Sequence, residues 1–187
     1  MKTVILTGFG RFGKYKSNLS ERVALFLDGQ IIGGYLIKSV IFGADIPPYN
    51  RGGEIFLTAQ RMKASGIISL GTSSKKKGFS IEVMARNLIS SQEYCPELSG
   101  LPIDDNNPIC AKVPLDLIEW YIPVFRGTCQ DAGINTEISD DFGGFCCNHL
   151  AYQVRLAQIF ASPEDYIPFI FMHIPCAKED VPNMEQL

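Results

Sequence analysis

The sequence predicts an α/β fold in which helices cover both faces of a mostly parallel β-sheet. Short apolar runs that end at glycines alternate along the chain with longer segments whose apolar residues recur at helical spacing. The chain has no internal repeat and no low-complexity linker. Its 187 residues are enough to form one domain, 1–187, with a sizeable core. This alternation is typical of a three-layer α/β/α architecture.

The N-terminal part of the chain is predicted to form a strand, a helix and a second strand. Residues 4–6 are apolar and run into a glycine turn, as a buried strand does. Apolar residues then recur at helical spacing over 18–27, and Ser17 or Asn18 can cap the start of that helix. Residues 35–42 form the next predicted strand.

The middle of the chain continues the alternation and then becomes irregular. A helix is expected around residues 55–63, after a pair of prolines that interrupts the chain. Residues 66–71 are apolar between two glycines, which is typical of a central strand in a parallel sheet. Residues 79–88 are expected to form another strand. Residues 91–112 are rich in proline, acidic and amide side chains, so we expect a lid or binding loop there.

The last part of the chain completes the predicted layers. Residues 115–132 form a helix that Pro123 disturbs, and residues 136–139 form a short strand. An amphipathic helix follows at 147–159, and an apolar strand at 167–172. Ligands of such sheets bind beside the loops that follow the carboxyl ends of the strands, so the functional site is expected at that edge.

Composition excludes several classes of protein. With 46% hydrophobic and 20% charged residues, the chain is not disordered. A net charge of -3 argues against a nucleic-acid partner. No apolar run approaches the roughly 20 residues needed to span a bilayer, and the first apolar run is shorter than that of a signal peptide. We therefore expect a cytoplasmic protein without a membrane partner.

Six cysteines are the least ordinary feature of the composition, and they include no CxxC pair. Metal clusters usually show such short repeated spacings, so we expect no metal site. A disulfide framework is unusual for a cytoplasmic chain of this size. The adjacent Cys146 and Cys147 could bond to each other only with strained geometry. Both are therefore predicted to be reduced.

Cys147 stands where a glycine-bearing turn enters a predicted helix. Backbone N–H groups and the positive end of the helix dipole favour a thiolate there, so the pKa of the thiol is expected to be lowered. The same N–H groups can stabilise an oxyanion during acyl transfer. Taken alone, a cysteine such as this is more often a buried, small packing side chain.

His173 and Glu82 are the candidate partners of Cys147. The chain has two histidines, and His173 follows an apolar strand, where it can act as a general base. His149 lies two positions after Cys147, where helical side chains point apart, so it is assigned to capping or packing. Glu82 lies in an apolar run, and burying a carboxylate is costly without a partner. Orienting His173 would supply that partner, whereas the alternative is a solvent-facing strand residue.

Four segments join these residues in one pattern. They are TGFGRFG at 7–13, SIEVMARN at 80–87, GFCCNHL at 144–150 and MHIP at 172–175. In their order and intervals they resemble pyroglutamyl peptidase I, also called pyrrolidone-carboxylate peptidase, the C15 family of cysteine peptidases. The resemblance covers nearly the whole chain, and the cysteine-asparagine-histidine-leucine element is its most specific part.

The resemblance implies a three-layer, phosphorylase/hydrolase-like α/β/α fold and a specific reaction. Cys147 would be the nucleophile, His173 the general base and acid, and Glu82 the residue that orients the imidazole. Members of the family remove an N-terminal pyroglutamyl residue from peptides through a thioester acyl-enzyme and need no metal or organic cofactor. Because the family often assembles into tetramers, the resemblance also implies a homo-oligomer.

The resemblance also implies a substrate pocket. Pyroglutamate is a small, flat, neutral lactam that suits aromatic walls and a few amide-directed hydrogen bonds. Phe9 and Phe12 match the family's aromatic wall, although core packing is the alternative for both, and Asn18 matches a polar residue nearby. Thr72 stands where the family usually has a glutamine that it uses at the lactam. Cys146 stands where a larger aliphatic residue is usual.

The departures from the family pattern leave other functions open. Thr72 cannot offer both amide functions of a glutamine, and Lys75-Lys76 replaces a glycine-arginine pair. A lysine run is most often solvated surface, but here it can change the charge at the mouth of the site. The chain stops soon after His173, so we expect the family's closing helix and some subunit contacts to be missing. The alternatives are a hydrolase of another small N-acyl or lactam group and an inactive homologue that binds a small ligand.

Overall fold

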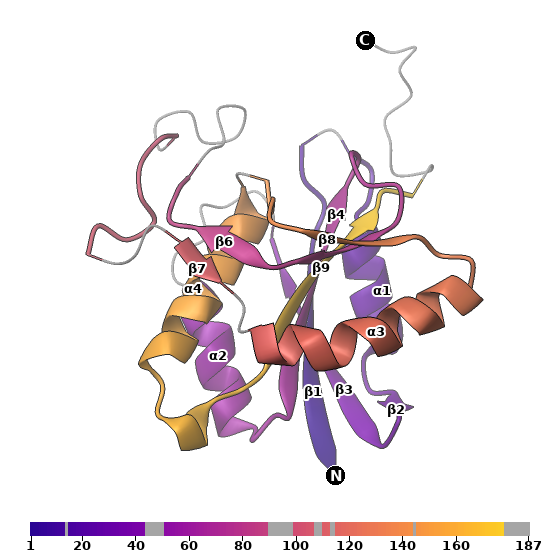
Figure 1. Ribbon diagram of the computed structural model, residues 1–187, viewed down its shortest axis with the longest axis horizontal. Coiled ribbons are helices and arrows are strands. Elements are labelled where there is room, and N and C mark those ends of the chain that lie inside the picture. Colours follow the sequence, from indigo (N-terminus) through magenta and orange to yellow (C-terminus); the bar gives the residue numbers. More distant parts are fainter. Residues whose placement is uncertain are drawn as a thin grey trace.

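The three-dimensional structure is a computed structural model (Figure 1). It describes residues 1–13, 15–43, 51–89, 99–106, 110–112, 115–143 and 145–177, with only the backbone for 110–112 and 115–121. The strands are β1 (Lys2–Phe9), β2 (Ile31–Ile32), β3 (Tyr35–Phe42), β4 (Gly66–Ser73), β5 (Phe79–Glu82), β6 (Met84–Arg86), β7 (Cys110–Lys112), β8 (Thr136–Ser139) and β9 (Phe169–Pro175). The helices are α1 (Leu19–Leu27), α2 (Arg51–Arg61), α3 (Leu115–Asp131), α4 (Cys146–Phe160) and a 3-10 turn, η2 (Pro163–Asp165).

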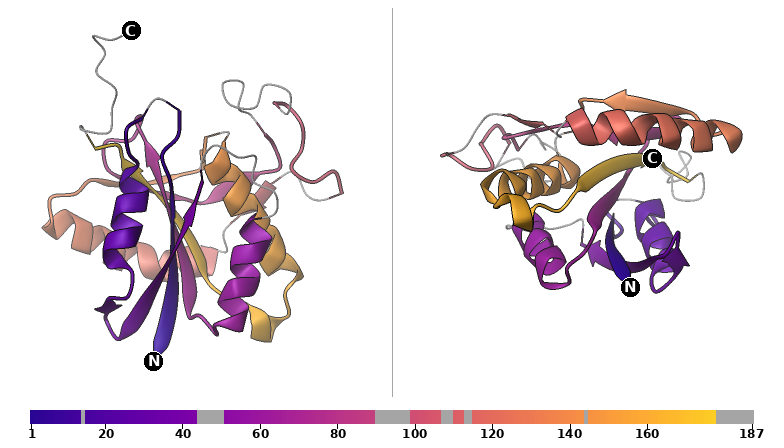
Figure 2. Two further views of the ribbon diagram at one scale, coloured as in Figure 1. Left: turned by 180° about the vertical axis from the view of Figure 1, so that it is seen from behind. Right: turned by 60° about the horizontal axis from the view of Figure 1, so that its bottom comes forward.

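The central sheet has seven strands in the order β2-β3-β1-β4-β9-β5-β8. Strands β3, β1, β4 and β9 are mutually parallel, and β8 is parallel to β5. The antiparallel neighbours are β2 with β3 and β5 with β9. Helices lie on both sides of the sheet (Figure 2). The predicted α/β fold with a mostly parallel sheet is therefore confirmed.

The two faces of the sheet carry different parts of the core. On one face, apolar residues of β1, β4 and β9 pack against α2 and α4 in the larger cluster, which includes Ile5, Ile67, Phe171, Phe56 and Leu150. On the other face, a smaller cluster from β1, β3 and β4 packs against α1. Helix α3 lies along β8 and β5, and its Phe125 stacks on Phe79. The larger cluster is the one that continues into the site.

Two predicted strands differ from the structure. Residues 79–88 do not form one strand, because the chain leaves the main sheet at Val83, whose N–H donates to the carbonyl of Ser139. Strand β6 then pairs with β7 in a separate two-stranded sheet. The last strand extends to Pro175, so His173 lies inside it rather than at its end. Pairing of β9 with β5 stops at His173. Pro175 lies beyond that point, where its missing N–H removes no hydrogen bond to β5.

Residues 91–98 and 107–109 of the predicted lid at 91–112 lie outside the described residues. The described stretch 99–106 is joined to the chain around Asn87. Asp104 N–H donates to Asn87 Oδ1 at 2.8 Å, and Gly100 N–H donates to the carbonyl of Ile89 at 2.7 Å. The strand β7 within this range was not predicted, because three residues give no usable alternation. The short edge strand β2 was missed for the same reason.

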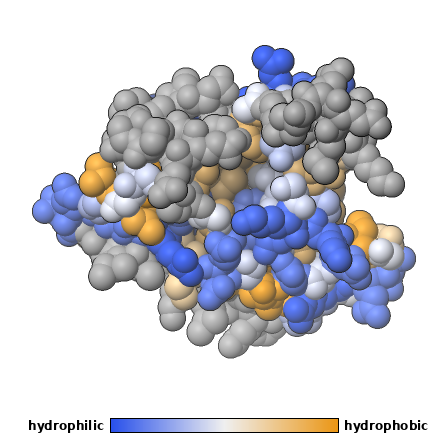
Figure 3. Space-filling view, turned by 90° about the horizontal axis from the view of Figure 1, so that it is seen from above, coloured by the Kyte–Doolittle hydropathy of each residue, from blue (hydrophilic) through white to orange (hydrophobic). Residues whose placement is uncertain are grey.

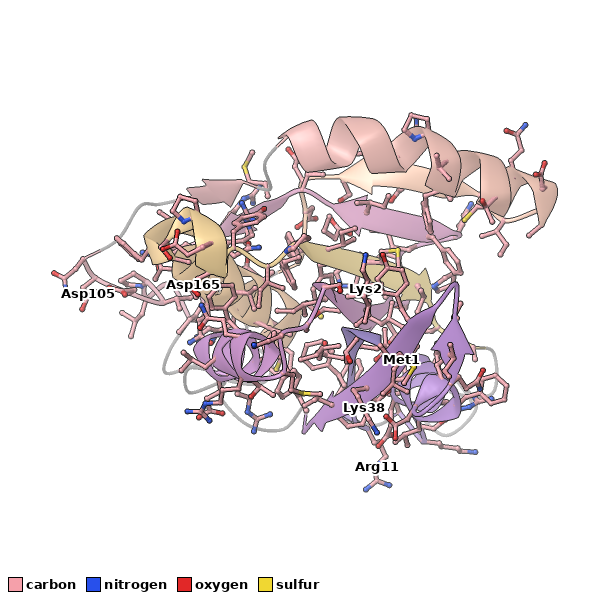
Figure 4. The ribbon with its side chains drawn as sticks, turned by 90° about the horizontal axis from the view of Figure 1, so that it is seen from below. Met1, Lys2, Arg11, Lys38, Asp105 and Asp165 are labelled. Atoms are coloured by element: carbon pink, nitrogen blue, oxygen red, sulfur yellow. The ribbon has the colours of Figure 1, made fainter. Side chains whose placement is uncertain are left out.

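The two ends of the sheet differ in what they present. Met1 and Lys2 mark the amino end of β1 in the view from below (Figure 4). Strands β1, β3, β4 and β9 all finish at the opposite end, the top of Figure 1. Within the described part of the chain, no helix is both long enough and apolar enough to cross a membrane.

Candidate active site

A cavity of about 380 Å³ opens at the carboxyl ends of β1, β4 and β9. Seen from that side, hydrophobic side chains lie in a recess between hydrophilic ones (Figure 3). The cavity is lined by Phe9, Phe12, Tyr15, Asn18, Thr72, Ser73, Ser74, Lys75, Lys76, Asp141, Phe142, Gly143, Phe145, Cys146, Cys147, His173 and Cys176. The site therefore lies where the predicted sheet topology places it, and it contains all five residues assigned to substrate binding.

His173 reaches the cavity from β9, and the sheet register determines its neighbours. It lies opposite Gly71 of β4 on one side and Ser80 of β5 on the other. Its side chain is nearly buried, and Nδ1 lies 2.8 Å from Glu82 Oε1. A carboxylate only accepts hydrogen bonds, so the ring donates its Nδ1–H and leaves Nε2 as the basic nitrogen.

Glu82 is completely buried at the end of β5. Of the two interpretations of this residue, the solvent-facing strand carboxylate is therefore wrong. The antiparallel register sets Glu82 opposite Phe171, two positions from His173 on the same face of the sheet. Phe171 and Phe142 pack edge-on against the imidazole with ring centroids 5.1 and 6.4 Å away, so the ring is held by both a carboxylate and aromatic contacts.

Cys147 lies in the first turn of α4, which begins at Cys146. Gly71 shows how close the thiol and the imidazole are. A Cβ atom on Gly71 would lie 2.9 Å from Cys147 Sγ and 3.0 Å from His173 Cδ2. Both groups therefore occupy the space beside one glycine, and the structure brings Glu82, Cys147 and His173 together. Only glycine leaves room for this approach.

The N-terminus of α4 presents backbone donors to the cavity. Phe145 is the N-cap residue and makes no side-chain capping bond, and no acidic residue lies in the first turn. The first N–H groups of a helix have no partner within the helix and carry partial positive charge. Phe145, Cys146 and Cys147 all line the cavity, so these donors border the space beside the thiol.

The expected lowering of the Cys147 pKa is wrong for this structure. Burial raises the pKa of the thiol well above its usual range, and the neighbouring Cys146 and Glu82 raise it further. A backbone hydrogen bond at Cys147 acts in the opposite direction but does not outweigh them. The apolar surroundings thus decide against the thiolate, and a nearby base must remove the proton.

The cysteines are reduced wherever their side chains are described. Cys146 and Cys147 are both thiols, which confirms the prediction for this pair, and Cys129 and Cys176 are thiols as well. Cys146 is buried and lines the cavity, as expected of a pocket residue. Cys176 lies there too, although no sequence pattern indicated it.

Lys76 lines the cavity and contacts two carboxylates that lie behind the lining, and we name the group of Lys76, Glu82 and Glu137 the charged wall. Lys76 Nζ donates to Glu137 Oε1 at 2.7 Å and to Ser139 Oγ at 3.1 Å, and it lies 3.7 Å from Glu82 Oε1. Burial opposes the charge on Lys76, but the bond to Glu137 and the charges of Glu82 and Glu137 outweigh it and raise its pKa. The same bond lowers the pKa of Glu137.

Asn18 and Thr72 also line the cavity, and we name the group that they form with the buried Ser20 the amide wall. Asn18 is the N-cap of α1, as predicted, and its Oδ1 accepts from Ser20 N–H at 3.0 Å and Ser20 Oγ at 2.8 Å. Thr72 Oγ1 donates to the same oxygen at 3.0 Å, and Asn18 Nδ2 donates to the carbonyl of Gly10 at 3.1 Å. Asn18 therefore joins the loop after β1 to the end of β4.

Phe9 and Phe12 form the aromatic side of the cavity together with Tyr15. Phe9 is nearly buried and contacts Phe42 and Phe171, with ring centroids 6.0 and 6.5 Å away. Phe12 packs on Tyr15 at 4.8 Å. Phe9 thus belongs to the core and to the cavity at once, so the two interpretations of it were not exclusive.

The second histidine is used elsewhere. His149 does not line the cavity; its Nε2 lies 3.1 Å from Gln153 Nε2, one turn further along α4. Gln153 Oε1 accepts from Gly52 N–H, so its amide nitrogen is the donor to the imidazole. Burial lowers the pKa of His149 to about 4, which suits a neutral acceptor. The assignment of His149 to packing rather than catalysis agrees with this arrangement.

Several residues of the site were not found from the sequence. Asn148 Oδ1 accepts from Arg86 N–H, while its Nδ2 donates to the carbonyls of Arg86 and Leu88, so it fastens β6 to the helix that carries the thiol. Its position directly after Cys147 was the only hint in the sequence that Asn148 belongs to the site. Phe142 was hidden in a glycine turn. No sequence pattern indicated the contact of Lys76 with Glu82, because folding alone brings the loop between β4 and β5 against β5 and β8.

No metal site is apparent in the described part of the chain, where no group of three or more His, Cys, Asp and Glu residues is suitably arranged. The chemistry available to the site is that of a thiol beside an imidazole and a carboxylate, bordered by helix N–H groups. This set of groups supports nucleophilic acyl transfer.

Comparison with known proteins gives consistent results. The family model described as pyroglutamyl peptidase matches residues 2–186. The chain is 28% identical over 188 residues to the pyrrolidone-carboxylate peptidase of Thermococcus litoralis, which covers 98% of this chain and 80% of the relative. It is 29% identical over 182 residues to that of Pyrococcus furiosus, with 95% and 83% covered.

Solved structures of the same kind are similar in fold. The pyrrolidone carboxyl peptidase from Thermococcus litoralis superposes with a TM-score of 0.78 at 22% identity, covering 98% of this chain and 80% of the other. A mutant pyrrolidone carboxyl peptidase from Pyrococcus furiosus superposes with a TM-score of 0.77 at 24% identity, covering 96% and 83%. The likeness shows a shared α/β architecture.

Proposed function

The chain belongs to the pyroglutamyl peptidase family, and on that premise we propose that it removes an N-terminal pyroglutamyl residue from peptides. The proposal treats 1–187 as one cysteine-peptidase domain that acts in the cytoplasm. Cys147 is the nucleophile, His173 the general base and acid, and Glu82 the group that orients the imidazole. One observation carries it: the Cys147 thiol and the His173 ring both lie beside Gly71, with Glu82 on Nδ1 of that ring.

The reaction begins with a proton transfer. His173 Nε2 takes the proton of the Cys147 thiol as the sulfur attacks the carbonyl carbon of the pyroglutamyl residue. The raised pKa of Cys147 makes this base necessary, since little thiolate exists beforehand. Negative charge then develops on the carbonyl oxygen, and the N–H groups at the start of α4 are placed to stabilise it.

Two stages follow, formation of the thioester and its hydrolysis. The imidazolium returns its proton to the leaving amine, the amide bond breaks, and a thioester joins Cys147 to the pyroglutamyl group. A water molecule then attacks the thioester while His173 takes its proton, and the thiol leaves with that proton as pyroglutamate is released. Glu82 accepts the Nδ1–H throughout, which keeps Nε2 directed toward the sulfur.

The cavity suits a flat, neutral acyl group. Phe9, Phe12 and Tyr15 offer aromatic surface for a five-membered lactam, and Phe142 closes the side next to His173. Ser73, at the end of β4, also lines the cavity and offers a hydroxyl to the lactam amide. A volume of about 380 Å³ accommodates one small ring and the start of a peptide.

Hydrolysis of a pyroglutamyl-anilide by the intact protein and by Cys147→Ala tests the proposal. We expect release of the aniline by the intact protein and a loss of at least about 10⁴-fold in Cys147→Ala, because the nucleophile is gone. Cys129→Ala is the matched control, since Cys129 is a buried thiol on α3 outside the cavity. Activity that persists in Cys147→Ala, or no activity in the intact protein, would contradict the proposal.

A second candidate substrate is another small N-acyl or lactam group. It is favoured by Thr72, whose hydroxyl is already committed to Asn18 Oδ1 and therefore does not donate to a substrate. A panel of blocked amino-acid anilides separates the two candidates. A clear preference for pyroglutamyl over every other acyl group would exclude the altered substrate, whereas preference for a different group would replace the first candidate with the second.

A further inference from the structure

Lys76 makes the contact in this site that the proposed mechanism does not use. It stands in the loop between β4 and β5, and its side chain is only 18% exposed. Its Nζ donates to two acceptors on β8, Glu137 Oε1 at 2.7 Å and Ser139 Oγ at 3.1 Å. From there it lies 3.7 Å from Glu82 Oε1, the same oxygen that accepts the His173 Nδ1–H at 2.8 Å.

Glu82 needs such a neighbour because it is completely buried. An ionised carboxylate without compensating charges is costly in a protein interior. Its other oxygen, Oε2, has no hydrogen-bond partner among the described residues. Among those residues, only Oε1 is therefore stabilised, by the hydrogen bond from the imidazole and by the nearby charge of Lys76.

The hydrogen bonds to Glu137 and Ser139 on β8 fix the position of the Lys76 ammonium group. Glu137 is 56% exposed and Lys76 only 18%, so this pair reaches from solvent into the site. The exposed carboxylate holds the direct hydrogen bond, while the buried one receives the charge at a longer distance. Lys76 is thus kept close to Glu82 without competing with His173 for the carboxylate oxygen.

We propose that Lys76 is a positioning residue of this site, held by Glu137 and Ser139 so that its charge balances Glu82 and disfavours a second positive charge on the His173 ring. The inference rests on the proposed function for its role in turnover. A neutral imidazole is what the mechanism requires, because the base must accept the proton of a buried thiol. A cation near the carboxylate keeps that imidazole from being protonated beforehand.

The charged and titratable groups around this point come from every element that borders it. They are Lys75 and Lys76 before β5, Glu82 on β5, Glu137 on β8, Asp141 after it, Cys146 and Cys147 on α4, and His173 on β9. Lys75 is exposed and lines the cavity, and the charge of Asp141 contributes to raising the pKa of Lys76. Lys76 is therefore the cation whose removal is expected to change the titration of His173 most.

The direct experiment is an NMR titration of the histidine ring signals in the whole protein. The chain has only two histidines, so few ring signals need to be assigned. In Lys76→Met we expect the ring of His173 to take up its proton at a higher pH than in the intact protein, because loss of a nearby cation makes protonation easier. Lys76→Arg should restore the midpoint of the intact protein.

Two further variants keep the test decisive. Lys77→Met removes the same charge from an exposed residue outside the cavity and should leave the midpoint unchanged. Lys76→Gln keeps an amide donor for Glu137 without the charge, and it replaces Lys76→Met if that variant does not fold. An unshifted midpoint in the Lys76 variants, or an equal shift in Lys77→Met, would overturn the proposal.

Activity gives an independent readout. If the protein cleaves a pyroglutamyl-anilide, the acid limb of its kcat/KM profile should move to higher pH in Lys76→Met and return in Lys76→Arg. An intact protein without activity contradicts the proposed function, while the NMR titration still tests Lys76. An active protein whose acid limb and ring titration do not change in Lys76→Met contradicts only the role of Lys76.

Discussion

The charged wall and the amide wall border the same cavity but are built from different interactions. In the charged wall, Lys76 and His173 converge on one oxygen of the buried Glu82. In the amide wall, Ser20 and Thr72 converge on one oxygen of the buried Asn18. The buried carboxylate thus has one hydrogen bond and one nearby cation, whereas the buried amide oxygen accepts several hydrogen bonds.

This difference separates chemistry from shape. A charge in a buried place acts on every titratable group nearby, so the charged wall determines how the imidazole and the thiol exchange protons. A neutral amide acts only through short, directed hydrogen bonds, so the amide wall determines where the loop after β1 lies. Changes in the first wall should therefore alter rate and pH dependence, and changes in the second should alter stability.

Glu82→Gln should produce the largest effect. The substitution removes the charge and can present an amide N–H to His173 Nδ1, which favours the wrong tautomer of the ring. We expect kcat/KM on a pyroglutamyl-anilide to fall about 10³-fold. Steady-state kinetics measure this loss. Glu164→Gln, on the exposed η2 turn, makes the same chemical change far from the cavity and should have no effect.

The outcome of this pair tests whether the charged wall does chemistry at all. Equal rates in Glu82→Gln and the intact protein would show that the buried carboxylate is structural only. Circular dichroism on both variants distinguishes a loss of rate from a loss of folded protein.

Gly71→Ala should produce an intermediate effect, because it crowds the thiol and the imidazole without removing either of them. The new Cβ would lie 2.9 Å from Cys147 Sγ, 3.0 Å from His173 Cδ2 and 3.1 Å from Phe171 Cζ. These groups must move by a few tenths of an ångström, and we expect activity to fall by about 10- to 100-fold with a stability loss of about 1–3 kcal/mol. Kinetics and urea unfolding measure the two effects.

Gly127→Ala is the matched control for this substitution. Gly127 lies in α3, and a Cβ atom there meets nothing within 4 Å. Alanine in a helix should stabilise the protein by about 0.5–1 kcal/mol and leave activity unchanged. Full activity in Gly71→Ala would show that the thiol and the imidazole are not confined by this glycine.

Asn18→Ala should produce the smallest effect on rate and a clear effect on stability. It removes the cap of α1 and leaves the Thr72 hydroxyl and the Gly10 carbonyl without their bonds to this side chain. We expect the free energy of unfolding to fall by about 2 kcal/mol and kcat/KM to fall by less than about tenfold. Urea denaturation and steady-state kinetics test this, with the exposed Asn106→Ala as the control for stability.

The Asn18 and Glu82 variants together decide whether the two walls differ as described. A 10³-fold loss of activity in Asn18→Ala without a change in stability would mean that this amide contacts the reacting group. In that case shape and chemistry would not be separated between the walls.

Local patterns were sufficient to predict much of the fold. Residue type and position left Ser17 and Asn18 as the candidate caps, and Asn18 is the one that caps α1. The apolar run at 66–71 was recognised as a central strand, and β4 lies in the middle of the sheet. Residues 79–88 failed because nothing local marks Val83 as the point where the chain leaves one sheet for another.

The site shows the same division. The helix start at Cys147 and the apolar strand before His173 were visible in the sequence, and the resemblance joined them to Glu82. Their surroundings were not visible. The expected low pKa of Cys147 considered only the helix N-terminus, whereas burial under neighbouring aromatic and thiol side chains raises it. Desolvation depends on what packs over a group, and a linear pattern does not contain that information.

By itself, the sequence determined the alternation of strands and helices, the cap of α1 and the choice of residues with nucleophilic and basic side chains. These properties depend on residues close together in the chain. The tertiary structure alone decided that Gly71 makes room for a thiol and an imidazole, that the charge of Lys76 lies near the Glu82 oxygen bound by His173, and that His149 stays away from the cavity. Each of these depends on sheet register and burial, which bring together groups that lie far apart in the sequence.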